Sequence, residues 1–272
     1  MRKIYIPLFL LLVASPQLFA QSRGKSVMND PIPLAMFEAT YAFHIPALDT
    51  RATYGVSHNV GGSFLYKTES NWLLKGNANF IFGNKVKGDR IDVFGEGITT
   101  THGEITGGGG LYSEFSIDQR GLHVQAELGR LFPFGPNPNC GFFVQVGLGY
   151  LYNRIRIDFE SNTYNTPYVV YGDYKYGYDR MRGGPAVHLE AGYLLLSDSR
   201  ITNVSLSLEM TYARTRDYRD YDFRVFTNPE TGVMEPVGFT DPNKRYNDLY
   251  IGIRACWIIP TYQRQPEEFY YN

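Results

Sequence analysis

Alternation of apolar and polar residues is the dominant pattern along this chain, and residues 203–212 show it most clearly. In a strand, successive side chains point to opposite faces. One face of this stretch would carry Val204, Leu206, Leu208, Met210 and Tyr212, and the other Asn203, Ser205, Ser207, Glu209 and Thr211. The pattern returns about nine times in segments close to ten residues long, and roughly 9–11 tilted residues cross a bilayer. It therefore predicts an antiparallel transmembrane β-barrel.

The alternation predicts nine strands directly. They cover residues 34–44, 56–67, 72–82, 108–117, 122–131, 141–153, 185–196, 202–213 and 247–259. Polar stretches at 69–71, 118–121 and 197–200 are expected to form tight turns between them. A barrel with both ends in the periplasm needs an even number of strands. We therefore assign a tenth strand to 167–176 and expect ten strands, with eight as the alternative if an early pair is misread.

The start of the chain is typical of a secretory signal peptide. Arg2 and Lys3 precede an apolar run at 4–19, and Ala20 offers a small residue at the cleavage point. The predicted organisation is a cleaved signal peptide at 1–20, a periplasmic lead-in at 21–33, a barrel at 34–259 and a tail at 260–272. Long outer loops are expected at 83–106, 173–184 and 214–246.

Composition narrows the possible functions only slightly. The formal net charge of −1 gives no basis for binding nucleic acid. An aromatic content of 15% and 28 glycines fit a barrel, but they also fit a secreted lectin-like sandwich. The two cysteines, Cys140 and Cys256, are expected near opposite rims, too far apart for a disulfide, and therefore as free thiols.

Charged residues recur on the faces that would point into the barrel. These are Glu38, Lys67, Lys75, His123, Glu127, His188, Glu190, Glu209 and Arg254. Charges inside a membrane protein often mark an ion or proton path. A barrel of eight to ten strands is barely wide enough for its own side chains, however. We therefore favour a plug of mutually paired side chains in the lumen.

No catalytic, metal or cofactor site is predicted. His188 and Glu190 share an inner face and could begin a metal site, but no third ligand stands at a diagnostic spacing, so a hydrogen-bonded pair is favoured. His44, His58 and His102 are expected near the outer side, where lipid-modifying barrel enzymes carry their catalytic set. Ser57 and His58 would point to opposite faces of one strand, so they are not a nucleophile and its base.

Tyrosine and arginine cluster in the predicted outer loops, at 164–180 and 214–224. Both residue types are enriched at interaction hot spots. The predicted partner-binding rim consists of Tyr171, Tyr174, Tyr176, Tyr178, Arg180, Tyr218 and Tyr221. The alternative is that strands continue beyond the membrane as a wet rim, with tyrosines anchored at the lipid headgroups.

Four segments carry a resemblance to a known family. They are GGSFLYKTESNWLLKGNANFIFGNKV (61–86), RLFPFGPNPNCGFFVQVGLGYLYNRIRI (130–157), DYKYGYDRMRGG (173–184) and DLYIGIRACWIIPTYQR (248–264). In these segments the chain resembles a largely uncharacterised family of outer-membrane β-barrels from Bacteroidota. The resemblance implies location in the outer membrane and insertion by the barrel-assembly machinery, and it brings no catalytic residues.

The expected function is structural or interactive, such as that of an accessory subunit in an envelope secretion or assembly complex. The expected partners are outer-membrane lipid, the barrel-assembly machinery during biogenesis and an envelope protein complex, without nucleic acid. A narrow passive pore and a lipid-modifying outer-membrane enzyme are the alternatives.

Overall fold

The computed structural model describes residues 28–88, 90–100, 102, 104–106, 112–113, 115–159, 174–197, 202–219, 221–236 and 243–261. The predicted signal peptide and most of the predicted tail lie outside these ranges. A search of the described helices for one both long and apolar enough to span a membrane finds none.

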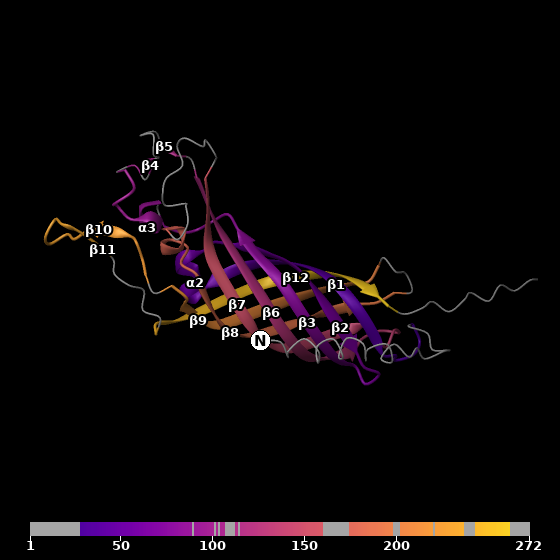
Figure 1. Ribbon diagram of the computed structural model, residues 1–272. Coiled ribbons are helices and arrows are strands. Elements are labelled where there is room, and N and C mark those ends of the chain that lie inside the picture. Colours follow the sequence, from indigo (N-terminus) through magenta and orange to yellow (C-terminus); the bar gives the residue numbers. More distant parts are fainter. Residues whose placement is uncertain are drawn as a thin grey trace, which may run out of the picture.

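Eight long strands form a closed antiparallel barrel (Figure 1). They are β1 (Leu34–Ala47), β2 (Ser57–Lys67), β3 (Trp72–Gly83), β6 (Phe115–Pro133), β7 (Gly141–Phe159), β8 (Arg182–Leu195), β9 (Val204–Asp217) and β12 (Arg245–Pro260). Each strand pairs with its neighbours in sequence order, and β12 closes the ring on β1, with Met36 opposite Pro260.

The prediction of ten strands is wrong, and the alternative of eight is correct. Of the expected strand 108–117, residues 115–117 begin β6, which runs straight through the expected turn at 118–121 and contains the expected strand 122–131. Tyr112–Ser113 belong to a small separate sheet, and residues 108–111 and 114 lie outside the described ranges. There Asp118 lies opposite Arg156 on β7, and Gln119 is buried inside the barrel. The ribbon of β6 and β7 continues beyond the lipid, where outward polar side chains meet water, so polarity did not mark a turn.

The tenth strand was needed only to restore an even number. Of its residues, 167–173 lie outside the described ranges, and Tyr174 begins a short 3₁₀ helix, η3 (Tyr174–Gly177). Merging the two pieces of β6 makes the count even without it.

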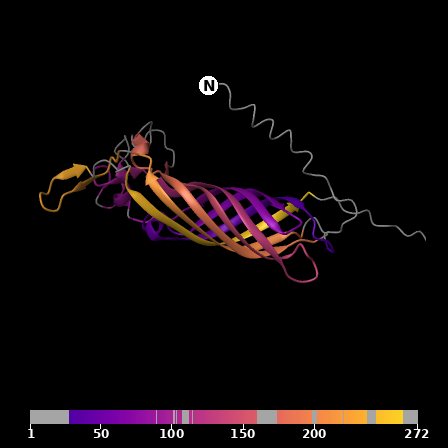
Figure 2. The same cartoon turned by 90° about the horizontal axis from the view of Figure 1, so that it is seen from below.

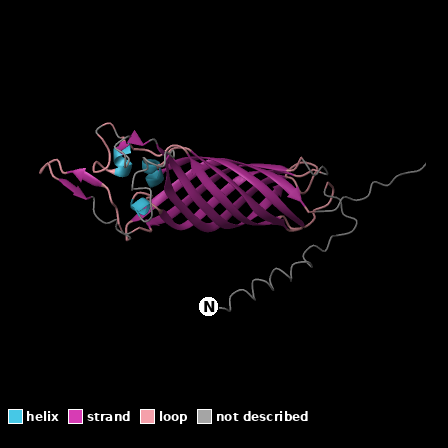
Figure 3. Cartoon of the chain, turned by 45° about the horizontal axis from the view of Figure 1, so that its top comes forward, coloured by secondary structure: helices cyan, strands magenta, loops and turns pink. Residues whose placement is uncertain are grey.

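The two ends of the barrel differ sharply (Figure 3). Short connections at 68–71, 134–140 and 196–203 share the end where β1 starts and β12 finishes. The opposite end carries the longer connections, with α2 (Leu48–Thr53), α3 (Arg90–Phe94), β4 (Ile105–Thr106) paired with β5 (Tyr112–Ser113), and β10 (Val225–Thr227) paired with β11 (Met234–Pro236). Outer-membrane barrels have short periplasmic turns and longer outer loops. We therefore call these the periplasmic end and the outer end.

The outer face of the barrel is an uncovered apolar belt. On β9 exposed and buried residues alternate without a break from Val204 to Asp217, and Leu208 is 65% exposed. Phe80, Val144 and Ile253 continue the belt on other strands, and no described helix or second sheet covers it. Soluble proteins rarely expose a continuous apolar surface of this extent. The belt is therefore a lipid-facing surface, and the strands span a membrane.

Aromatic side chains gather on the outer face near the periplasmic turns. These are Trp72, Phe132, Phe134, Phe142 and Tyr193, with Phe142 packed against both Phe134 and Tyr193. An even-numbered antiparallel barrel with an apolar belt and an aromatic girdle is the architecture of outer-membrane proteins. This architecture places the chain in an outer membrane.

Both cysteines are free and buried, but their expected placement at opposite rims is wrong. Cys140 immediately precedes β7, and Cys256 lies near the end of β12, so both lie toward the periplasmic end. The cause is again β6. Counting it as two strands reverses the direction of β7, which in the structure begins at the periplasmic turn.

Candidate functional site

The lumen holds the charged residues that the alternation pointed inward. All nine charged residues predicted to point inward are at most 5% exposed. Eight of them make up the predicted lumen network: Glu38, Lys75, His123, Glu127, His188, Glu190, Glu209 and Arg254. Lys67 is also buried, but it lies at the periplasmic end, where its ammonium donates to the backbone carbonyl oxygen of Ile32. The central residues form three connected groups.

The first group is a lysine between two carboxylates. Lys75 Nζ on β3 lies 3.2 Å from Glu38 Oε2 on β1 and 3.1 Å from Glu190 Oε2 on β8. The hydroxyl of Ser63 donates to Glu38, and Ser207 Oγ donates to Glu190 Oε1 at 2.7 Å. Lys75 therefore joins opposite walls of the barrel through ion pairs that are shielded from water.

The second group centres on Glu209 of β9. Arg254 Nε lies 2.5 Å from Glu209 Oε2, and His44 Nε2 contacts the other carboxylate oxygen. His44 was expected near the outer side; it lies toward the outer end of β1, and its side chain is buried in the lumen. The inward direction of its side chain could have been predicted, because His44 is an even number of residues from Glu38 and Thr40 on the same strand. Gly252 leaves room for the ring, since a Cβ there would lie 2.4 Å from His44 Cδ2.

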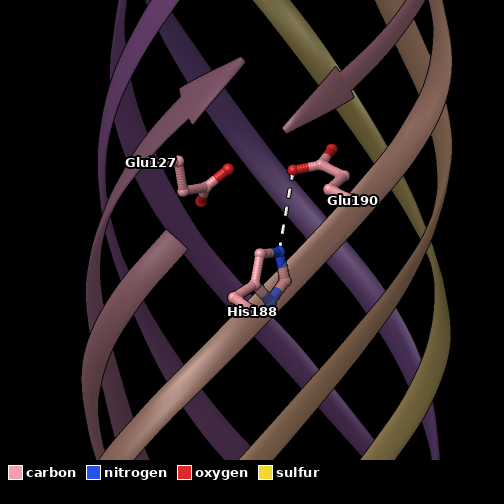
Figure 4. A group of neighbouring side chains, drawn as sticks. All are labelled: Glu127, His188 and Glu190. Carbon is pink, nitrogen blue, oxygen red and sulfur yellow. Dashed lines mark ion pairs between the residues drawn. The ribbon is translucent and has the colours of Figure 1, made fainter. Parts of the chain in front are cut away.

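The third group joins β6 to β8. His188 Nδ1 lies 2.9 Å from Thr211 Oγ1, whereas His188 Nε2 is 3.8 Å from Glu190 Oε2, too far for a hydrogen bond. The expected pair of His188 and Glu190 is therefore present as a contact at ion-pair distance and not as a hydrogen bond (Figure 4). Glu127 Oε1 accepts a 2.5 Å hydrogen bond from Gln125 Nε2. One ligating atom from each of Glu127, His188 and Glu190 lies within 4.8 Å of the others (Figure 4).

A layer of buried apolar side chains lies on each side of these groups. Toward the periplasmic end the layer consists of Ile32, Leu34, Met36, Leu65, Leu73, Leu131, Cys140, Phe143, Leu194, Leu196 and Ile258. Toward the outer end it consists of Ile81, Leu151, Ala186, Ala213 and Tyr250. Above the second layer, α2 covers the mouth, where Thr50 Oγ1 donates to Asp248 Oδ1 at 2.8 Å. The charged centre thus lies between two clusters of buried apolar side chains, and in the outer one Gln119 and Asn153 donate hydrogen bonds to the Tyr250 hydroxyl.

The outer loops have a small core of their own. Val93, Phe94, Ile105 and Tyr178 are buried together, and Phe115, Ile117 and Ile157 of the β6–β7 ribbon pack against them. Burial raises the pKa of the Tyr178 hydroxyl, with a further contribution from Asp222. Tyr178 was predicted to bind a partner, but it is enclosed in this core, so that assignment is wrong.

The other predicted rim residues do not form one free surface. Tyr174 is 60% exposed. The Tyr176 ring lies beneath the Arg219 guanidinium, with 4.3 Å between the ring centroid and Arg219 Cζ. Tyr221 stacks on Phe223, and Tyr218 contacts the Tyr150 hydroxyl. Tyr171 lies outside the described residues. The sequence showed the enrichment in tyrosine but not which rings pack against the loops themselves.

Arg180, the last predicted rim residue, donates to the backbone carbonyl oxygen of Asp92. Burial, reinforced by the nearby Arg224, lowers the pKa of its guanidinium to about 10. It lines a cleft of about 100 Å³ together with Arg182, Arg219 and Arg224. Those three pair with Asp217, Asp179 and Asp222 at 2.9, 3.0 and 2.5 Å respectively. Arg182 thus joins β8 to β9, Arg219 joins two loops, and Arg224 pairs within its own segment, so these arginines are paired with carboxylates of the protein itself.

Comparison with known proteins finds weak structural similarity and no family. No family model matches the chain, and no curated protein matches it. Similar solved structures include Ail, the attachment invasion locus protein of Yersinia pestis, with a TM-score of 0.39 and 9% identity over 84% of this chain and 99% of that chain. The complex of Ail with the heparin analogue sucrose octasulfate gives a TM-score of 0.37 and the same identity and coverage.

Neisserial surface protein A is similar at a TM-score of 0.34 and 11% identity, over 81% of this chain and 95% of that chain. At these scores the similarity transfers neither a ligand nor an activity. The fold assignment rests on the strand pairing and the apolar belt of this chain.

Proposed function

We propose that the protein is a non-catalytic outer-membrane barrel with a structural and interaction role, exerted by its outer loops rather than by transport through its lumen. One observation carries the proposal: the ion-paired centre of the lumen lies between two apolar layers. An aqueous channel needs a continuous polar path. Here buried apolar side chains interrupt the polar lining on both sides of the charged centre. The alternative of a narrow pore is therefore not favoured.

The outer end offers a surface for a partner. Tyr112, Tyr174, Phe223, Val233 and Met234 are large apolar residues that lie exposed on the loops, beyond the lipid-facing belt. The hairpin of β10 and β11 projects away from the barrel (Figure 2) and carries Val233 and Met234. Exposed apolar residues outside the membrane are characteristic of protein interaction sites. The partner we propose is another protein of the envelope.

The hairpin is held at its base. The backbone N–H of Glu96 donates to the carbonyl oxygen of Val225 at 2.7 Å. In return, Thr227 donates to Glu96 Oε2 from its backbone N at 2.8 Å and from its hydroxyl at 2.5 Å. A hairpin fixed at its base loses less conformational entropy on binding than a free loop. These contacts support the more specific proposal that the protein is an accessory subunit of an envelope complex. Membership in the Bacteroidota family remains a prediction.

The test is affinity purification from detergent-solubilised envelopes of the native host. We expect the wild-type chain to recover a companion at constant stoichiometry, and the double variant Val233→Asp, Met234→Asp to lose it. The matched control is Glu230→Gln, an exposed change in the same loop. Recovery of the barrel alone from every sample would contradict the accessory role.

Two further measurements separate this proposal from its alternatives. We expect no single-channel conductance in planar bilayers, and a steady conductance would favour the pore. We also expect unchanged lipid A masses after deletion of the gene, whereas altered masses would favour the enzyme.

A further inference from the structure

We propose that the lumen binds one divalent transition-metal ion between Glu127, His188 and Glu190. The three side chains are buried, and one nitrogen and two oxygen atoms from them converge within 4.8 Å (Figure 4). The sequence offered only His188 and Glu190, so no site was predicted. The third ligand, Glu127, comes from a different strand and is found only from the register.

A glycine on the strand between them allows the three residues to meet. Glu127 lies on β6, and His188 and Glu190 lie on β8, with β7 between these strands. Gly147 of β7 is opposite Glu127 on one side and opposite His188 on the other. A Cβ at this position would lie 2.7 Å from Glu127 Cγ. The missing side chain therefore opens the route by which Glu127 approaches His188.

Two of the three candidate ligands have an atom without a hydrogen-bond partner, and one of these atoms, His188 Nε2, lies 3.8 Å from Glu190 Oε2 and 3.7 Å from Glu209 Oε2. Glu127 Oε2 and His188 Nε2 are buried without a hydrogen-bond partner, although the other polar atom of each side chain is engaged. When His188 Nδ1 donates its proton to Thr211, Nε2 presents its lone pair toward the carboxylates. A histidine oriented by a hydrogen bond through its second nitrogen is the usual arrangement around a bound metal.

The charge of the surrounding cluster favours a divalent cation. Four buried carboxylates, Glu38, Glu127, Glu190 and Glu209, stand against two permanent cations, Lys75 and Arg254. With its three histidines neutral, this central part of the described lumen has a formal charge of −2. Uncompensated buried charge is costly. One divalent ion brings the formal sum to zero, while Lys75 remains in contact with Glu190 Oε2.

The donor set indicates the class of metal. Calcium and magnesium prefer sites made entirely of oxygen, whereas an imidazole nitrogen suits zinc, iron, nickel and copper. Three protein ligands, one of them histidine, leave a fourth position for water at a tetrahedral zinc ion. Bound there, the ion would tie β6 to β8 across β7. Zinc is therefore the probe we choose.

The experiment measures zinc retained by the folded full-length barrel. The chain is refolded into detergent with zinc chloride and desalted, and its metal content is measured by mass spectrometry. We expect one zinc ion per wild-type chain, and background levels for Glu127→Gln and His188→Gln. Thr211→Val removes only the hydrogen-bond partner of Nδ1 and should weaken zinc affinity about 10–100-fold.

Matched controls distinguish coordination from general charge effects. Asp248→Asn changes another buried lumen carboxylate to an amide, and His58→Gln removes a histidine on the outer face that contacts Tyr41. Both should retain one zinc ion per chain. Cobalt bound in place of zinc should give a visible absorption band that Glu127→Gln abolishes.

Three results would overturn the proposal. They are absence of zinc from the folded wild type, full retention by folded His188→Gln, and equal loss in Asp248→Asn and Glu127→Gln. If the ligand variants do not fold, Thr211→Val decides, and an unchanged zinc affinity in that variant contradicts the site.

Discussion

At the residue scale, the lumen is stabilised by charges that depend on one another. Lys75 is the clearest case, because it contacts both Glu38 and Glu190 where none of the three side chains meets solvent. Desolvation makes each of these charges expensive on its own, and only their pairing offsets that cost. Removing one member therefore does more harm than the loss of a surface ion pair.

Replacing Lys75 by methionine tests this dependence. We expect Lys75→Met to lower the free energy of unfolding by about 3–5 kcal/mol, because two carboxylates lose their cation. Urea titration of the barrel in lipid vesicles measures the change. Lys87→Met, at an exposed loop position, should stay within about 0.5 kcal/mol of wild type. Equal stability of the two variants would contradict the account of the lumen.

Two glycines, Gly252 on the inner face and Gly76 on the outer face, give a second prediction at this scale. A Cβ at Gly252 would lie 2.4 Å from the His44 ring and 2.5 Å from the carbonyl oxygen of Phe43, whereas at Gly76 it would meet nothing within 4 Å. Gly252→Ala should therefore cost about 1–3 kcal/mol through overpacking. Gly76→Ala should cost much less in the same urea titration. A larger cost at Gly76 would be inconsistent with this packing.

At the element scale, strand positions could be predicted from the sequence, but strand ends could not. Alternation reports only which face a residue occupies, and it continues where β6 and β7 rise above the lipid. Asp118, which lies opposite Arg156 in that region, was predicted to belong to a turn because it is polar. The outward-facing side chains are apolar only within the membrane, whereas the pairing of β6 with β7 continues beyond it.

The same limit applied to the candidate site. Parity along a strand predicted that Glu127, His188 and Glu190 point inward. Their meeting depends on the register of three strands and on the missing side chain of Gly147. Neither can be obtained from one sequence. In the loops, burial of Tyr178 depends on α3, which the sequence did not predict.

The anchor of the outer hairpin gives a prediction for pH. Hydrogen bonds from the Thr227 hydroxyl and backbone lower the pKa of Glu96. A lowered folded-state pKa contributes stability that is present above the usual glutamate pKa and is lost as the pH falls through the lowered one. Protease protection of residues 225–236 should therefore decline over that acidic range. In Glu96→Gln, protection should be weaker at neutral pH and nearly independent of pH. A wild-type profile that this variant reproduces would contradict the assignment.

At the scale of the whole molecule, the protein combines a lipid-facing exterior, a closed lumen and a loop layer at one end. These features belong together. A barrel of eight strands has an interior that its own side chains fill. A surface that binds other molecules must then lie at an end of the barrel. In the described residues, extensive loops occur only at the outer end. The proposed interaction role follows from this division.

Two neighbouring residues at the same depth on β7 test whether the apolar belt faces lipid while the opposite face of each strand is enclosed. Val144 points outward on β7 and Phe143 inward. With Trp72 and Trp257 replaced by phenylalanine, a single tryptophan is introduced as Val144→Trp or Phe143→Trp in vesicles containing lipids brominated on their acyl chains. We expect strong fluorescence quenching of the tryptophan at position 144 and little quenching at position 143. Equal quenching at both positions, or stronger quenching at 143, would contradict it.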